Sequence, residues 1–203
     1  MIGIVNYKMG NLASLLNSLE KIGVEATIVK EGEKLKGCDR AILPGVGAFG
    51  DACEYMRQAG LDEAIKEFAA QGKPLLGVCL GLQLLFESGE ESPGAIGLGL
   101  LKGHIERFNP AKAAHTIKIP HMGWNKLRVT RPSPLFKGIN DGDRLYFVHS
   151  YYAACAESLA IGKAFYGYEF VCAIEQDNVF AIQPHPEKSH NIGLQILKNF
   201  AEL

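Results

Sequence analysis

The chain lacks long apolar runs and an excess of charge of either sign, and each absence excludes a class of protein. No stretch approaches the roughly 20 consecutive apolar residues of a membrane-spanning helix, so we expect no membrane association. The 21 Lys and Arg residues nearly balance 22 Asp and Glu residues, for a net charge of -1. This balance gives no support for nucleic-acid binding. No basic-then-apolar signal opens the sequence, and we expect a cytoplasmic protein.

Cysteines are few, odd in number and scattered, without a C-x-x-C pair. There are five: Cys38, Cys53, Cys79, Cys155 and Cys172. This pattern argues against a disulfide framework and against a structural metal site, and it fits a reducing compartment. The glycines of residues 97–103 miss the G-x-G-x-x-G spacing of a dinucleotide site. We therefore expect neither a metal nor a cofactor.

What the chain does contain is a first half in which short apolar strands alternate with helical patterns. Its 203 residues, 47% of them apolar, suit one domain spanning residues 1–203. The alternation predicts an α/β fold with an open, mostly parallel, twisted sheet and helices on both faces. The expected strands are Ile2–Val5, Ala26–Val29, Arg40–Leu43 and Pro74–Val78, and the expected helices are Leu12–Ile22 and Asp51–Gln71, the latter broken at Gly60.

The second half is richer in short β segments separated by Gly, Asn and Asp turns, which predicts antiparallel additions to the sheet. The expected strands are Leu100–Phe108, Lys126–Thr130, Leu145–Tyr152, Phe165–Phe170, Val171–Glu175 and Val179–Gln183. A final helix is expected over His190–Phe200, where apolar residues recur at helical spacing.

Cys79 lies where an apolar strand gives way to a helix, between Gly77 and Gly81. Glycines on both sides of a tight strand-to-helix turn allow close backbone packing and leave the side chain between them exposed for chemistry. The N-terminus of the following helix favours a thiolate. These features indicate a nucleophile, although a cysteine beside an apolar strand is also commonly a small buried hydrophobic residue.

His185 and Glu187 follow the last expected strand, so they belong at the same carboxyl edge of the sheet as Cys79. A histidine there can act as general base toward a thiol and then as general acid toward a leaving amine. Glu187 can orient the imidazole and stabilise its protonated form. Alone, such a loop is more often structural, but together with the glycine-flanked cysteine it predicts a Cys–His–Glu triad.

The segments Gly77–Gln83 and His185–Ser189 resemble the class I (triad-type) glutamine amidotransferase family. The resemblance implies hydrolysis of glutamine to glutamate and ammonia through a γ-glutamyl thioester on Cys79. The Leu80 N–H is one expected donor to the oxyanion, and the residues Gly45, Val46 and Gly47 resemble the strand that supplies the second. Gln83 matches a position that contacts bound glutamine in the family.

Three further segments, Asn6–Asn11, Pro120–Asn125 and Tyr146–Tyr152, resemble one branch of this family, the glutaminase subunits of imidazole glycerol phosphate synthase. This implies a heterodimer with a (β/α)₈-barrel cyclase that receives the ammonia. The cyclase converts the ribonucleotide PRFAR to imidazole glycerol phosphate and AICAR in histidine biosynthesis. The residues expected at the partner interface are His121, Met122, Trp124, Asn125 and Tyr146.

Three other interpretations remain open at the level of sequence. The same glutaminase chemistry can serve another synthase, such as that for pyridoxal phosphate or anthranilate. The chain can be a non-catalytic binding module on the same fold, or a cysteine peptidase or γ-glutamyl hydrolase.

One departure from the family is Pro184, which stands where an aromatic residue is more common. We also expect the strand Gly45–Gly47 to hold glutaminase activity low until the partner binds.

Overall fold

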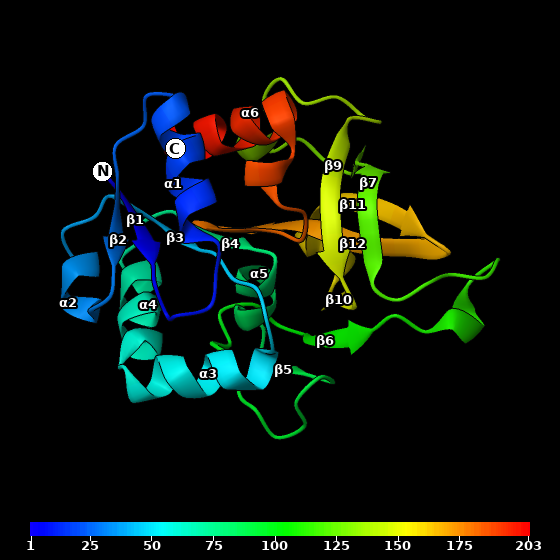
Figure 1. The fold of residues 1–203 in the computed structure, drawn as a ribbon, viewed down its shortest axis with the longest axis horizontal. Helices are drawn as coiled ribbons and strands as arrows, with labels where there is room; N and C mark the ends of the chain where they lie inside the picture. The colour runs from blue at the N-terminus through cyan, green and yellow to red at the C-terminus, as the bar shows by residue number, and fades with distance from the viewer.

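Figure 1 shows the computed structural model, which describes residues 1–203, as a twisted sheet with helices on both of its faces. Helices α1 (Leu12–Lys21) and α6 (His190–Ala201) lie on one face. Helices α3 (Phe49–Gln58), α4 (Leu61–Ala70) and α5 (Leu80–Leu84) lie on the other. The short helix α2 (Gly32–Leu35) packs beside α4. The predicted α/β architecture is confirmed.

Five neighbouring strands form the parallel part of the sheet, in the order β2-β1-β3-β4-β13. Their bounds are β1 Ile2–Val5, β2 Ala26–Val29, β3 Arg40–Leu43, β4 Leu75–Val78 and β13 Val179–Ile182. Every residue of β1, β4 and β13 is buried, because helices cover both faces of these strands. The carboxyl ends of β4 and β13 therefore lie side by side at one edge.

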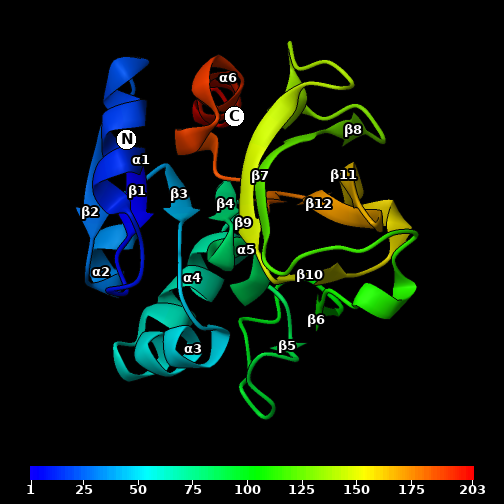
Figure 2. The ribbon, with the colours of Figure 1, turned by 45° about the vertical axis from the view of Figure 1, so that its right-hand side comes forward.

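The second half extends the sheet mainly with antiparallel strands, as predicted. These strands are β5 Ser88–Gly89, β6 His104–Arg107, β8 Arg128–Val129, β10 Tyr151–Ala154, β11 Ala160–Tyr166 and β12 Tyr168–Gln176. Strands β7 (His121–Lys126) and β9 (Arg144–His149) form a separate antiparallel pair, which Figure 2 shows between the parallel strands and β11. Single 3-10 turns occupy Pro110–Lys112, Pro134–Phe136, Glu157–Leu159 and Pro186–Lys188.

Several predicted bounds in this half are wrong. The predicted strands Phe165–Phe170 and Val171–Glu175 are parts of a β11–β12 hairpin that turns at Gly167, whose φ of 75° suits a tight turn. Only the end of the predicted strand Leu100–Phe108 is a strand, and the predicted strand Leu145–Tyr152 is two. Strand β7 is missing from the prediction, because its sequence HMGWNK does not alternate cleanly between apolar and polar residues.

The apolar core is divided between the two faces of the sheet. One cluster of 30 buried residues includes Phe49, Ile65 and Leu84 from α3, α4 and α5. A second cluster of 26 includes Leu15 and Ile196 from α1 and α6. These helices bury one stripe each against the sheet, as their apolar spacing predicts. None of the helices combines the length and the apolar character that crossing a membrane requires.

Candidate active site

Cys79 lies directly between β4 and α5 and has an unusual backbone conformation. Its φ is 54° and its ψ is -110°, an uncommon combination for a residue with a side chain. The Cys79 N–H donates to the Ile182 carbonyl at 2.9 Å, so β13 holds the turn in place. Such strain is typical of functional sites, and this is the geometry that the glycine-flanked sequence predicts.

The two flanking glycines allow α5 to pack against the sheet at short range. A Cβ on Gly81 would lie 1.7 Å from the Leu43 carbonyl oxygen, and one on Gly77 would lie 2.7 Å from the Gly81 carbonyl oxygen. Neither position has room for a side chain. The glycines are therefore required for packing, which places the first turn of α5 immediately beside the sulfur.

His185 and Glu187 come to this turn from the segment that follows β13. The Nδ1 atom of His185 lies 2.8 Å from Oε1 of Glu187, and both side chains are almost completely buried. The backbone N–H of His185 donates to the Tyr146 carbonyl at 2.9 Å, and the backbone carbonyl of His185 accepts from the Ser189 hydroxyl. With Nδ1 engaged by Glu187, Nε2 is left for the thiol. Pro184 does not disturb this pairing.

The electrostatics of His185 favour its protonated form. Burial lowers the pKa of the imidazole, but the neighbouring Cys79 thiol and the Glu187 carboxylate together outweigh burial and raise it. A raised pKa means that the ring readily holds a proton taken from the thiol. The arrangement can therefore support an imidazolium beside a cysteine nucleophile.

A cavity of about 370 Å³ opens over the cysteine. Its lining includes Cys79, His185, Leu80 and Gln83, together with Val46 and Gly47 from the loop after β3. The opposite wall comes from β9 and β10, residues 148–151, and from Glu91 and Pro120. The structure thus brings two residues of the predicted triad, two of the predicted oxyanion segment and Gln83 around one space large enough for an amino acid, and the third triad residue, Glu187, contacts His185 from outside the lining.

The Leu80 N–H, the first expected oxyanion donor, is occupied within the protein. It donates to the Gly45 carbonyl oxygen at 3.3 Å. An acceptor therefore stands where an oxyanion would have to bind. A rotation of the Gly45–Val46 peptide would release the Leu80 N–H and turn the Val46 N–H toward the site.

Tyr7 braces the segment that would rotate. Its buried hydroxyl donates to the Pro44 carbonyl at 2.6 Å, and a Cβ on Gly45 would lie 1.8 Å from that hydroxyl oxygen. Gly47 has a φ of 107°, which few residues other than glycine adopt. The glycines of this segment therefore allow both the present conformation and an alternative one.

The five residues predicted at a partner interface all lie on the β7–β9 pair. The side chains of Met122 and Trp124 are exposed (63% and 44%), and Trp124 stacks on the His190 ring at 5.0 Å. Tyr146 pairs with Trp124 across the two strands. Asn125 is partly buried, and the His121 ring is only 3% exposed and faces the interior.

Several residues at the site were not predicted from the sequence, among them His149 and Tyr151 in the cavity lining and Gln183 beside Cys79. Gln183 is completely buried, and its amide nitrogen lies 3.7 Å from the Cys79 sulfur. His149 and Tyr151 belong to a segment that was used only for its resemblance to the family. Their place in the site depends on β9 and β10 folding back across the end of β4, which local patterns do not reveal.

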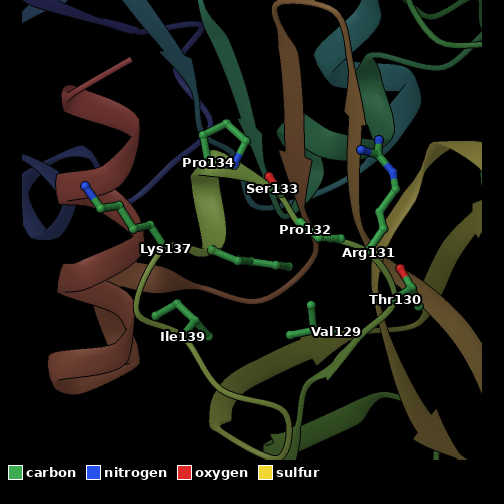
Figure 3. Close-up of a pocket in the computed structure, with 9 residues that line it drawn as sticks. Val129, Thr130, Arg131, Pro132, Ser133, Pro134, Lys137 and Ile139 are labelled. Carbon is green, nitrogen blue, oxygen red and sulfur yellow. The ribbon is translucent and has the colours of Figure 1, made fainter.

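A larger cavity of about 730 Å³ lies elsewhere, along residues 129–139 (Figure 3). Its lining combines Arg131 and Lys137 with prolines and apolar residues and contains neither cysteine nor histidine. Nothing in this lining corresponds to the Cys–His–Glu arrangement, so the cavity over Cys79 is the candidate active site.

The fold and this site are those expected of a cysteine-dependent hydrolase of the α/β class. The family model for class-I glutamine amidotransferases matches residues 4–203, and the chain belongs to this family. It is 56% identical to imidazole glycerol phosphate synthase subunit HisH of Sulfurimonas denitrificans, over 100% of this chain and 98% of that protein. It is also 56% identical to subunit HisH of Wolinella succinogenes, over the whole of both chains, and 46% identical to that of Methanocaldococcus jannaschii.

Solved structures agree on the fold. A crystal structure of a glutamine amidotransferase superposes with a TM-score of 0.76 at 21% identity, covering 100% of this chain and 99% of that one. A chain in the structure of PurLQS from Thermotoga maritima superposes with a TM-score of 0.77 at 22% identity, covering 99% of this chain and 97% of that one. At these identities, the likeness is evidence for the fold alone.

Proposed function

We propose that residues 1–203 form one glutamine amidotransferase domain that acts as the glutaminase subunit of an imidazole glycerol phosphate synthase. The chain hydrolyses glutamine and delivers the ammonia to a cyclase subunit, a (β/α)₈ barrel, for histidine biosynthesis. The observation that carries this proposal is the full-length 56% identity to HisH subunits. All five cysteines are free, which fits a cytoplasmic protein.

The mechanism begins with proton transfer from the Cys79 thiol to Nε2 of His185, while Glu187 holds Nδ1. The thiolate attacks the side-chain amide carbon of glutamine, and the carbonyl electron pair moves to oxygen to give a tetrahedral oxyanion. His185 returns its proton to the amide nitrogen, so that the carbon–nitrogen bond breaks and ammonia leaves. Water activated by His185 then hydrolyses the γ-glutamyl thioester to glutamate and restores the thiol.

The hydrogen bond between Leu80 and Gly45 supports a resting state of low activity. While the Gly45 carbonyl occupies the Leu80 N–H, the developing oxyanion lacks a donor that is worth about 3–4 kcal/mol in a related reaction. We propose that the cyclase, with its ligand bound, favours rotation of the Gly45–Val46 peptide. The isolated chain should then hydrolyse glutamine roughly 10²–10³-fold more slowly than the complex.

The decisive experiment reconstitutes the chain with its cyclase barrel and measures imidazole glycerol phosphate formed from PRFAR. Glutamine should support turnover by the wild-type complex, and Cys79→Ala or His185→Ala should lower it at least about 10³-fold. Added ammonium salts should restore product formation in both variants, because the cyclase is intact. Unchanged turnover by Cys79→Ala would refute a catalytic role, and a wild-type chain that serves only a pyridoxal phosphate or anthranilate synthase would refute the assigned partner.

A further inference from the structure

A row of buried and partly buried hydrogen bonds connects β7 to the wall of the proposed glutamine cavity. The Asn125 amide nitrogen lies 3.2 Å from Nε2 of His121, and Nδ1 of His121 lies 3.0 Å from Nε2 of His149. Nδ1 of His149 lies 2.8 Å from the Tyr151 carbonyl oxygen. Because His149 and Tyr151 line the cavity, the row ends at the site itself.

The positions of the hydrogens in this row follow from its last member. A carbonyl oxygen can only accept, so Nδ1 of His149 carries the hydrogen. Burial lowers the pKa of His149 to about 3 and that of His121 to about 4, so both rings are neutral. Nε2 of His149 must then accept from Nδ1–H of His121, whose own Nε2 accepts from Asn125. All donors point toward Tyr151.

A second row reaches the same carbonyl from the side of Cys79. The Gln83 amide nitrogen lies 3.3 Å from the Tyr151 oxygen and 3.4 Å from Oε1 of Gln183. The Gln183 amide nitrogen in turn lies 3.7 Å from the Cys79 sulfur. If the Gln83 amide turned over, its oxygen would meet two other oxygens, so Tyr151 and Gln183 fix its orientation.

We propose that His149 is a positioning residue for the glutaminase reaction. His149 donates to the Tyr151 carbonyl, and the hydrogen bond from His121 holds the His149 ring in the orientation that this donation needs. The Tyr151 carbonyl is thereby kept where it fixes the Gln83 amide in the cavity. The inference rests on the proposed function and adds to it a pair of histidines outside the triad. His121 therefore acts through His149 and Tyr151. Its ring is buried and is not exposed to a partner.

The donation from His121 keeps the His149 ring in place. If His121 could not donate, Nε2 of His149 would be a buried acceptor without a donor, an arrangement that costs free energy. A His149 ring that turned to relieve this would take Nδ1–H away from the Tyr151 carbonyl oxygen, which it meets at 2.8 Å. The carbonyl would shift, and Gln83 would lose the acceptor that orients it.

Two replacements of His149 separate its two nitrogens. In His149→Asn, the amide nitrogen takes roughly the place of Nδ1, and the donation to Tyr151 can persist. In His149→Gln, the amide reaches roughly the place of Nε2, and that donation is lost. Both variants are assayed in the reconstituted complex, with glutamine and, separately, with ammonium salts as the nitrogen source.

We expect His149→Gln to raise the KM for glutamine about tenfold while kcat changes less than threefold, because the contact of Gln83 with bound glutamine is weakened equally in the ground and transition states. His149→Asn should keep KM within about threefold of wild type. Turnover with ammonium salts should be unchanged in both. Equal KM values for wild type and His149→Gln, or an equal loss in glutamine- and ammonia-dependent turnover, would overturn the positioning role.

A second variant guards against a folding defect at His149. His121→Phe retains stacking on Tyr166 and Phe147, whose ring centres lie 4.2 and 4.9 Å from that of His121, but it cannot donate to His149. Like His149→Gln, it should raise the KM for glutamine, and an unchanged KM would contradict the inference. A wild-type complex without glutamine-dependent turnover would instead refute the proposed function itself.

Discussion

At the scale of single residues, the site depends on histidines in opposite electrostatic environments. His185 faces a thiol and a carboxylate, which raise its pKa despite burial. His121 and His149 face one another and aromatic rings, and burial lowers the pKa of both. One histidine is thus prepared to hold a proton, whereas the other two remain neutral donors and acceptors. Sequence alone does not distinguish these roles, because the three residues differ only in what the fold places beside them.

The neutral pair predicts a loss of stability on mild acidification. An unfolded chain binds protons at His121 and His149 below about pH 6.5, whereas the folded chain does so only near pH 4 and pH 3. The free energy of unfolding should therefore fall by about 1.4 kcal/mol per pH unit for each histidine between pH 6.5 and 4. His185 has the opposite sign, but its stabilising contribution is complete below pH 6.5 and does not change over this interval. Urea unfolding at pH 7, 6 and 5 measures the slope.

The matched control for this slope is His121→Phe, which removes one titrating ring. Its slope between pH 6 and 5 should be smaller than that of the wild type by about one histidine's contribution, even though the variant starts from a different stability at pH 7. Identical slopes would show that His121 is not held neutral in the folded chain.

At the scale of elements, the turn from β4 into α5 depends on the absence of side chains at its two glycines. In Gly81→Ala, the new methyl group would overlap the Leu43 carbonyl, and rigid backbone on both sides prevents easy relief. We expect a loss of about 2–3 kcal/mol of stability, a fall in the unfolding temperature of about 5 °C or more, and reduced glutaminase activity, because α5 carries Leu80 and Gln83. Thermal unfolding and the reconstituted assay measure these effects.

Gly37→Ala is the control for this substitution. A Cβ at Gly37 meets only the Lys34 carbonyl oxygen at 3.8 Å, an ordinary contact, so stability should change by less than about 0.5 kcal/mol. If Gly81→Ala lowered stability as little as Gly37→Ala, the close packing of α5 on β3 would not be what positions Cys79.

The elements also show how far the sequence can be interpreted. Strands β1, β2 and β3 have the predicted bounds, because each is a short apolar run between clear turns. The predicted triad residues meet because two parallel strands must end at the same edge. Strand β7 lacks such local signals, and the position of the β7–β9 pair at the cavity over Cys79 depends on contacts between distant segments. Consequently, one wall of the cavity, with His149 and Tyr151, emerges only from the structure.

At the scale of the whole molecule, the proposed partner surface and the cavity share the same two strands. Residues alternate along β7, so that Met122 and Trp124 face outward while His121 and Asn125 face β11 and the interior. Val46, on the segment proposed to rotate, is also exposed at 41%. A partner bound over this region would therefore contact the same strand from which the hydrogen-bonded row runs to the site.

Trp124 provides the test of this surface. It is half exposed, stacks on His190 and presents a large rigid ring, which is the kind of residue that anchors protein interfaces. Trp124→Ala should weaken binding of the cyclase by about 2 kcal/mol, roughly 30-fold in Kd, with little change in unfolding temperature. Ile96→Ala is the matched control, because Ile96 is still more exposed at 66% but lies on the loop between β5 and β6, away from β7 (Figure 1). Isothermal titration calorimetry measures both, and equal affinities for the two variants would place the cyclase on a different face of the molecule.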